Sequence, residues 1–226
     1  VGGSSPDERV QIRNRGVAAD DYFGQLDFNA GSNVHIANAD ITNGGKGLTE
    51  MVSIDSTNVL LEDSTISGSI GTTRSVYIVS QNLKPTLRNL TIQNGVGYAV
   101  AQGSANMAPI YDNLVLQGNT INGVYLNTST GVNFDLTLNI DELNGSSYYA
   151  GSITLQAGRA ITLTPGTDLR LVSGATIVIN TGARLHMVGT PDRWITLRPD
   201  KSNPTINDYW GSVDIRTGAT ARFKYC

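Results

Sequence analysis

Apolar residues recur along the chain in pairs two positions apart, and the pairs recur at a fixed interval. Between residues 161 and 189 a new pair begins every eight residues, and Gly166, Gly174 and Gly182 keep the same step. The pairs are Ile161/Leu163, Leu169/Leu171, Ile177/Ile179 and Leu185/Met187. Side chains two positions apart point to the same face of a β-strand. This stretch therefore predicts short strands joined by glycine turns, with no room for helices.

A longer period groups these strands into coils, each coil being one turn of a solenoid. One apolar row steps by 24 residues each time, through Val52, Val76, Val100 and Val124. A second row steps by 25, 26 and 24 residues, through Ile41, Ile66, Ile92 and Leu116. Two positions after each member of the second row stands Asn43, Gly68, Asn94 or Gly118. Glycine and asparagine tolerate positive φ, so a tight corner is expected there.

An inward apolar row followed by a fixed corner predicts coils that bury their apolar faces against one another. We therefore predict an all-β, right-handed parallel β-helix that forms a single domain over residues 1–226 in about nine coils of roughly 24 residues. A β-sandwich explains the short strands but not a register that stays in phase. A β-propeller needs longer repeats. Residues 133–156 break the register and are expected to hold a longer turn or a looser coil.

The beginning and the end of the chain carry the same passage. DYFGQLDFNAG (21–31) returns as DYWGSVDIRTG (208–218), and VGGSSPDERVQIR (1–13) matches VGTPDRWITLR (188–198) once two residues are dropped. Passage 1–39 thus recurs at 188–226, which predicts a segment of a longer tandem-repeat chain, processed or cropped. In this register Cys226 matches Ala39, which favours a small inward residue over a reactive thiol.

The composition and net charge of the chain exclude some classes of binding partner. Only 15% of the residues are charged and the net charge is −3, so no basic field exists for nucleic acid or an anionic membrane. No apolar run approaches the roughly 20 residues of a membrane span, and membrane insertion is not expected. A single cysteine cannot form an internal disulfide framework.

The C-terminal third resembles a known group of proteins. LTPGTDLRLVSGATIVINTGARLHMVGTPDRWITLRP and DYWGSVDIRTGATARFKYC resemble the right-handed parallel β-helix repeat proteins of bacterial secreted and cell-surface chains, within the pectate-lyase-like superfamily. The matching segments are Gly166–Leu169, Gly182–Thr190, Trp194–Leu197 and Trp210–Gly211. NVHIANADITNGG, NVLLEDSTISGS and PTLRNLTIQNG look like coil repeats of the same superfamily. The resemblance implies an extracellular or cell-surface location. It does not imply one activity, because this scaffold hosts lyases, hydrolases, adhesins and structural rods.

Residues able to carry catalysis are sparse. Glycoside hydrolases need two carboxylates at a defined separation, and the acidic residues here are scattered, with Asp40 and Asp63 the nearest to a row on one face. His35 and His186 alternate with apolar neighbours, so both are expected at the surface. They lie far apart in the sequence, whereas a zinc site needs clustered ligands. We name no catalytic residue, and the pattern favours a protein without enzymatic activity.

The sequence is compatible with two kinds of binding site, one for glycans and one for calcium. Tyr22, Phe23, Trp194, Tyr209 and Trp210 can stack on sugar rings, which would make cell-surface glycans a partner. The competing interpretation is that the aromatic residue before Gly24 or Gly211 packs where a loop re-enters the coil. Calcium is the one cofactor considered, through oxygen ligands of Asp20, Asp21, Asn207 and Asp208.

The sequence thus predicts a structural or adhesive extracellular module. Its partners would be itself or adjacent repeats, through end-to-end stacking of coils, and this predicts open coil edges at both ends. The alternatives are a polysaccharide-active enzyme, either a lyase or a depolymerase, and a passive glycan-binding module.

Overall fold

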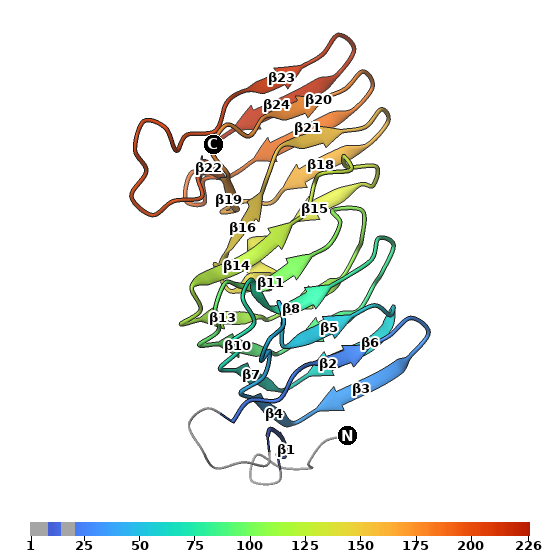
Figure 1. The fold of residues 1–226 in the computed structure, drawn as a ribbon. Helices are drawn as coiled ribbons and strands as arrows, with labels where there is room; N and C mark the ends of the chain where they lie inside the picture. The colour runs from blue at the N-terminus through green and yellow to red at the C-terminus, as the bar shows by residue number, and fades with distance from the viewer. Residues whose placement is uncertain (1–8, 15–20) are drawn as a thin grey trace. The chain divides into compact units, whose positions relative to one another are not determined.

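Stacked parallel strands dominate the fold. The computed structural model describes residues 9–14 and 21–226. Strands account for 45% of the chain and helices for 2%, and the named strands pair in parallel. The prediction of an all-β parallel β-helix is confirmed. Figure 1 shows the strands as successive arrows from blue to red.

The described residues divide into two compact units. The first runs to Gly103 and adds Ala108–Val124 and Glu142–Asn144. The second comprises Ser104–Met107, Tyr125–Asp141 and Gly145–Cys226. Strand β14 (Ile121–Leu126) begins in the first unit, and its last two residues belong to the second. The single domain expected over residues 1–226 stays a prediction.

Three parallel stacks build the first unit. One stack is β1 (Val10–Ile12), β4 (Ala39–Thr42), β7 (Thr65–Ser67), β10 (Thr91–Gln93) and β13 (Val115–Gln117). The second contains β2 (Leu26–Phe28), β5 (Val52–Ile54), β8 (Arg74–Ile78) and β11 (Tyr98–Gln102). The third is β3 (Asn33–Ala37), β6 (Asn58–Glu62), β9 (Thr86–Arg88) and β12 (Ile110–Asp112). Each coil contributes one strand to each stack, so that its apolar side chains are buried by the coils above and below.

The second unit repeats this plan. Its stacks are β16 (Ser147–Ala150), β19 (Asp168–Leu171) and β22 (Thr196–Pro199); β17 (Ile153–Leu155), β20 (Ile177–Ile179) and β23 (Val213–Ile215); and β15 (Leu136–Leu138), β18 (Ala160–Leu163), β21 (Arg184–Val188) and β24 (Thr220–Lys224). The 3₁₀-helix η2 (Ile140–Leu143) lies between β15 and β16, and its last two residues belong to the first unit. It falls in the region 133–156, where the sequence predicted a departure from the regular coil.

The apolar rows expected from the sequence are in register. Val52, Val76 and Val100 are direct partners across β5, β8 and β11. Ile41, Ile66, Ile92 and Leu116 are partners across β4, β7, β10 and β13. The corners after the second row also have the expected backbone, since Asn43, Gly68, Asn94 and Gly118 have φ values of 61°, 68°, 56° and 66°. A one-residue slip would move every inward side chain outward, so the apolar rows fix this register.

The last turns of the chain are longer than the regular coil expected from the sequence. Leu169 is the partner of Leu197 across β19 and β22, and Ile177 is the partner of Val213 across β20 and β23. The additional residues of the final turn form a loop between β22 and β23. The stacking amounts to about seven turns, whereas the sequence predicted about nine.

Candidate interface at the last coil

The last coil, made of β22, β23 and β24, lies at one end of its three stacks. Within the described residues each of these strands pairs with one neighbour only: β22 with β19, β23 with β20 and β24 with β21. Their opposite edges therefore present backbone N–H and C=O groups that another parallel strand can bind. In Figure 1 these strands carry the orange and red of the C-terminal end.

Inward-facing apolar side chains are exposed on this coil. Ile215 is the partner of Ile179, and Phe223 is the partner of Met187. Ile179 and Met187 are 0% and 2% exposed, whereas Ile215 and Phe223 are 45% and 46% exposed. The positions belong to the same inward rows, and the difference arises because none of the described strands packs on the far side of β23 and β24. The sequence pattern predicted Ile215 as inward but not Phe223, although Phe223 is the counterpart, in the second passage, of the inward Ile36.

The margin of this exposed face is cationic. Arg222 is opposite His186 on the outward side, and Lys224 follows two positions later. The Lys224 ammonium lies 5.0 Å from the centre of the Tyr225 ring. Arg216 bonds Asn180 and lies 3.5 Å from Asp214. A partner that brings carboxylates to this margin would be attracted electrostatically.

The repeated passage has the same backbone at both places. Strand β23 stands in the second passage where β2 stands in the first, and β24 stands where β3 does. Gly31 and Gly218 have φ values of 80° and 79°. The turn at each of these glycines is closed alike, by Ser32 N–H to Asn29 O at 3.0 Å and by Ala219 N–H to Arg216 O at 2.9 Å. The sequence match therefore reflects one structural element that occurs twice.

The predicted aromatic residues occupy different environments. The Phe23 ring packs against Gly44 and Met51. A Cβ added to Gly44 would lie only 2.5 Å from the Phe23 ring and 2.5 Å from the Met51 side chain. Trp210 is half-buried, and the next residue donates from its N–H to Ala175 O at 2.7 Å. These contacts agree with a loop that re-enters the coil. Tyr22 is half-buried.

Trp194 and Tyr209 have exposed side chains but lie on separate segments. The Trp194 indole donates to Pro191 O at 3.0 Å, and its ring meets the Tyr225 ring edge-on with centroids 6.2 Å apart. Tyr209 lies in the loop before β23, and its carbonyl accepts from Gly174 N–H at 3.1 Å. Tyr209 and Trp210 are thus neighbours on one loop, whereas Trp194 belongs to the margin of the last coil.

Only some of the residues considered as calcium ligands lie within the described residues. Asp20 lies outside the described residues, and Asp21 is half-buried. Asp208 Oδ2 accepts from the N–H and the hydroxyl of Thr205, at 2.8 and 2.7 Å, and these bonds lower the pKa of Asp208. The Asn207 carbonyl accepts from the Ser173 hydroxyl at 2.6 Å. In the part of the chain that the structure describes, no three His, Cys, Asp or Glu side chains gather as a metal site would require.

Asp40 and Asp63 do not form a pair. The register places Asp40 opposite Thr65, where it accepts from Arg9 at 2.7 Å and Gln11 at 2.8 Å. Asp63 precedes β7, has a φ of 49° and stands at a corner. The two carboxylates therefore occupy different positions in successive coils. His35 is an outward residue, as predicted, and bonds Glu62 at 2.7 Å.

A ladder of hydrogen-bonded residues at one corner of the coils was not predicted from the sequence. Asp63, Asn89, Asn113 and Asn144 all have positive φ, and each amide donates to the preceding member at 2.8 to 3.0 Å. The near-regular spacing of the first three could have revealed it. All four belong to the first unit, where the ladder fixes consecutive coils at one corner.

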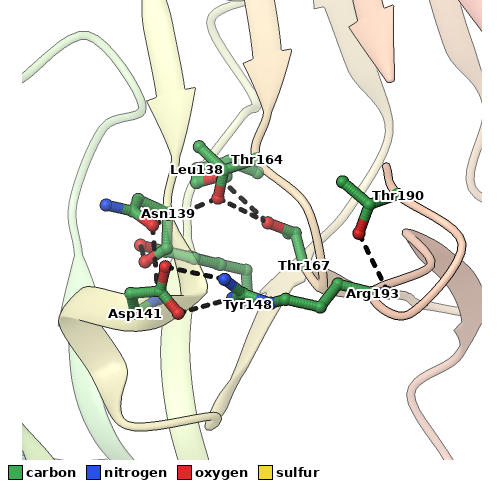
Figure 2. Close-up of polar contacts among 8 residues, drawn as sticks. All are labelled: Leu138, Asn139, Asp141, Tyr148, Thr164, Thr167, Thr190 and Arg193. Carbon is green, nitrogen blue, oxygen red and sulfur yellow. Dashed lines mark hydrogen bonds and ion pairs between the residues drawn. The ribbon is translucent and has the colours of Figure 1, made fainter. Parts of the chain in front are cut away.

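A second polar cluster lies within the second unit, at the start of η2. Figure 2 shows the Arg193 guanidinium meeting the Asp141 carboxylate of η2 through two bonds, of 3.1 and 2.5 Å. Nearby, Thr164 and Thr167 both donate to Leu138 O, and Tyr148 donates to Asn139 O at 3.1 Å. The side chains are paired with one another and with backbone, so the cluster positions η2 and the turn at Thr190–Arg193.

Comparison of the chain with protein-family models, with curated proteins and with solved structures found no match. None of the helices in the described ranges has the length and apolar character of a membrane span.

Proposed function

We propose that the chain is a structural and adhesive module of a bacterial secreted or cell-surface protein, and that its last coil binds a further coil end to end. The resemblance to β-helix repeat proteins of the pectate-lyase-like superfamily supports the location and a right-handed winding. Handedness has a second support, because parallel crossover connections are right-handed in about 98% of cases.

The exposed inward residues of the last coil carry this proposal. Covering Ile215 and Phe223, each close to half exposed, would contribute about 1 kcal/mol apiece. Pairing the open edges of β22, β23 and β24 would add backbone hydrogen bonds, each with a net contribution of about 1 kcal/mol. Stacking of a coil is therefore favourable in the same way as stacking within each unit.

Charge pairing also favours a structural role over catalysis. Four carboxylates that face outward each bond arginine: Asp40 with Arg9, Glu50 with Arg74, Glu62 with Arg88, and Asp168 with Arg170 and Arg198. The arginine bonds lower the pKa of Glu62 and, against the effect of burial, that of Asp168, whereas a general acid needs a raised pKa. The polysaccharide-active enzyme remains the alternative with less support.

A passive glycan-binding module is the second candidate, favoured by the exposed rings of Trp194 and Tyr209. Exposed aromatic rings are able to stack on sugar faces. A glycan array on the purified chain tests this candidate, and uniform lack of binding would remove it.

End-to-end stacking predicts association that depends on protein concentration. Sedimentation velocity of the purified chain should show larger species as concentration rises. Phe223→Glu should abolish them, because it places a charge on the apolar end face. The matched control is Ile110→Glu on β12, where Ile110 is 55% exposed but faces outward from the coil.

Ile110→Glu should leave association unchanged. A chain that stays monomeric at every concentration would contradict end-to-end stacking, and so would equal effects of the two substitutions.

A further inference from the structure

Two consecutive turns of the second unit enclose a cavity of about 250 Å³ that is open to solvent. The loop of residues 127–131 follows β14 and forms the first wall, and residues 151–154, at the step from β16 to β17, form the second wall. Side chains with a hydroxyl or an amide line most of the cavity: Tyr125, Asn127, Thr128, Ser129, Ser152 and Thr154. Gly131 and Gly151 complete the lining, so none of the described residues that line the cavity is charged.

Hydrogen bonds within the second unit hold the first wall in place. Ala105 N–H donates to Asn127 O at 2.7 Å, and the Asn106 side-chain amide donates to Gly131 O at 2.9 Å. Gly131 N–H also donates to Thr128 O at 2.9 Å, which closes the loop. This wall is therefore formed before a ligand arrives, and a preformed site avoids the entropic cost of ordering a loop on binding.

The second wall is held by the turns on either side of it. Val132 N–H donates to Thr154 O at 2.8 Å, so the chain after the loop pairs with β17. Ser152 Oγ accepts from Thr176 N–H at 3.1 Å. That bond uses the oxygen of Ser152, and the hydroxyl still has a hydrogen to donate. The polar groups of this wall are thus fixed by backbone contacts while they line the cavity.

Tyr125 and Gly151 give the cavity its shape. Val124 and Leu126 are 0% and 1% exposed, so the Tyr125 side chain between them lies on the outward side of β14, and it is half-buried. A Cβ added to Gly151 would meet only Thr128 Oγ1, at 3.8 Å, and the φ of Gly151 is not in the left-handed region. A larger residue at Gly151 would therefore fill the cavity without backbone strain.

We propose that this cavity binds one ring of a neutral sugar. Hydroxyl and amide groups donate and accept hydrogen bonds, as the hydroxyls of a sugar do, and the apolar face of a sugar ring can stack on the Tyr125 ring. Sites for drug-sized ligands have about 300 to 1,000 Å³, so this smaller cavity has room for a single ring and not for a longer segment. The inference rests on the adhesive part of the proposed function and not on stacking at β22–β24.

The uncharged lining should select among sugars. A uronic acid would bring its carboxylate to a cavity that no described arginine or lysine lines, and the loss of hydration of that charge would not be compensated. A neutral hexose or N-acetylhexosamine carries hydroxyl and amide groups, which the lining can pair. Neutral sugars should therefore bind at least about tenfold more tightly than uronic acids of the same ring size.

An amide NMR titration of the chain tests the inference. The probes are the methyl glycosides of glucose, galactose, mannose and N-acetylglucosamine, and the charged controls are the methyl glycosides of glucuronic and galacturonic acid. A ligand of this size should bind with a Kd of about 1 mM. At least one neutral probe should shift the amide signals of Ser129, Gly131, Gly151 and Thr154, and the charged controls should leave them unchanged at the same concentration.

Gly151→Leu separates this cavity from other surfaces, because it fills the cavity and leaves every polar side chain in place. It should weaken binding of the neutral probe by at least about tenfold. The matched control is Gly24→Leu, which should leave binding unchanged, since Gly24 also lacks a left-handed φ and a Cβ there would meet only Leu48, at 3.7 Å. Tyr125→Leu removes the ring alone and should weaken binding about tenfold. Circular dichroism checks the folding of each variant, and Tyr125→Leu decides the question if Gly151→Leu does not fold.

Absence of shifts with every neutral probe would overturn the inference, and so would shifts confined to other residues or equally tight binding of the uronic acids. Equal binding by the wild type and by folded Gly151→Leu would also overturn it. If a glycan array nevertheless showed binding, the adhesive function would stand and its site would lie elsewhere. A chain that binds a neutral probe in this cavity but never associates would support the sugar site and contradict end-to-end stacking.

Discussion

Asp168 shows how an outward position on a coil accommodates charge. It is 6% exposed and accepts hydrogen bonds from Ser147 on the preceding coil and from Thr196 and Arg198 on the following coil. Arg170, on the same strand, donates at 3.0 Å. Burial opposes ionisation, but these hydrogen bonds outweigh it and lower the pKa of Asp168 to about 2.

Asp168→Asn should lower the free energy of unfolding at neutral pH by about 2 to 3 kcal/mol, because two guanidinium groups lose their shared acceptor. The pKa is depressed in the folded state, so the stabilisation is present above the unfolded pKa of about 4. It is lost as pH falls toward 2. Denaturant unfolding of wild type and variant at pH 7 and near pH 3 measures both effects, and the difference between the two proteins should fall to about half at the lower pH.

Asp214→Asn is the matched control, because Asp214 also lies near an arginine but has a side chain that is 54% exposed. It should change stability by less than about 1 kcal/mol. Equal effects of the two substitutions, or a wild-type advantage that is as large at pH 3 as at pH 7, would contradict stabilisation by the ionised Asp168.

Residues differ in how far the sequence alone could predict their roles. The corners at Asn43, Gly68, Asn94 and Gly118 were predictable because a positive φ restricts residue type at a fixed spacing. The partners of Asp168 were not, since Ser147 and Arg198 come from the coils before and after it. Tyr148 is the partner of Leu169 and Leu169 is the partner of Leu197, steps of 21 and 28 residues rather than 24, so regular spacing would not have pointed to them.

At the scale of the element, close approach of consecutive coils depends on particular glycines. At Gly97, before β11, a Cβ would lie 2.0 Å from the Thr73 carbonyl oxygen of the preceding coil. That oxygen accepts from Tyr98 N–H at 2.8 Å, so it cannot move without loss of the stacking bond. Gly47 has a similar φ, 74° against 79°, but open space where its Cβ would be.

Gly97→Ala should therefore be much more destabilising than Gly47→Ala. Both substitutions bear the cost of a positive φ, about 1 kcal/mol. Gly97→Ala should cost about 2 to 3 kcal/mol more, because it forces two backbones apart. Thermal and denaturant unfolding of the two variants measure the difference, and equal losses would mean that stacking at this corner is not tight.

Strands were predictable where their period was regular. The eight-residue step between 161 and 189 predicted β18, β19, β20 and β21, and each apolar pair lies inward on its strand. The helix η2 was not predictable, because so short a segment carries no periodicity. Its position depends on long-range contacts, among them the bonds from Arg193 to Asp141.

At the scale of the whole molecule, the repeated passage accounts for the last strands, because β23 and β24 repeat β2 and β3. The match between DYFGQLDFNAG and DYWGSVDIRTG was visible in the sequence and suggested a phase marker of a repeating solenoid. The structure adds that strands, corner angles and turn hydrogen bonds coincide at both places. It also adds the exposed inward residues of the last coil, which sequence could not show because burial depends on what stacks above.

The central claim is that β22–β24 form an open end on which another coil stacks. Amide hydrogen exchange of β23 and β24 tests it most directly, measured on the chain at low and at high protein concentration. The account predicts that amides of Val213–Ile215 and Thr220–Lys224 exchange at least about tenfold more slowly at the concentration where larger species form, while β20 and β21 change little. Unchanged exchange in β23 and β24 would contradict it.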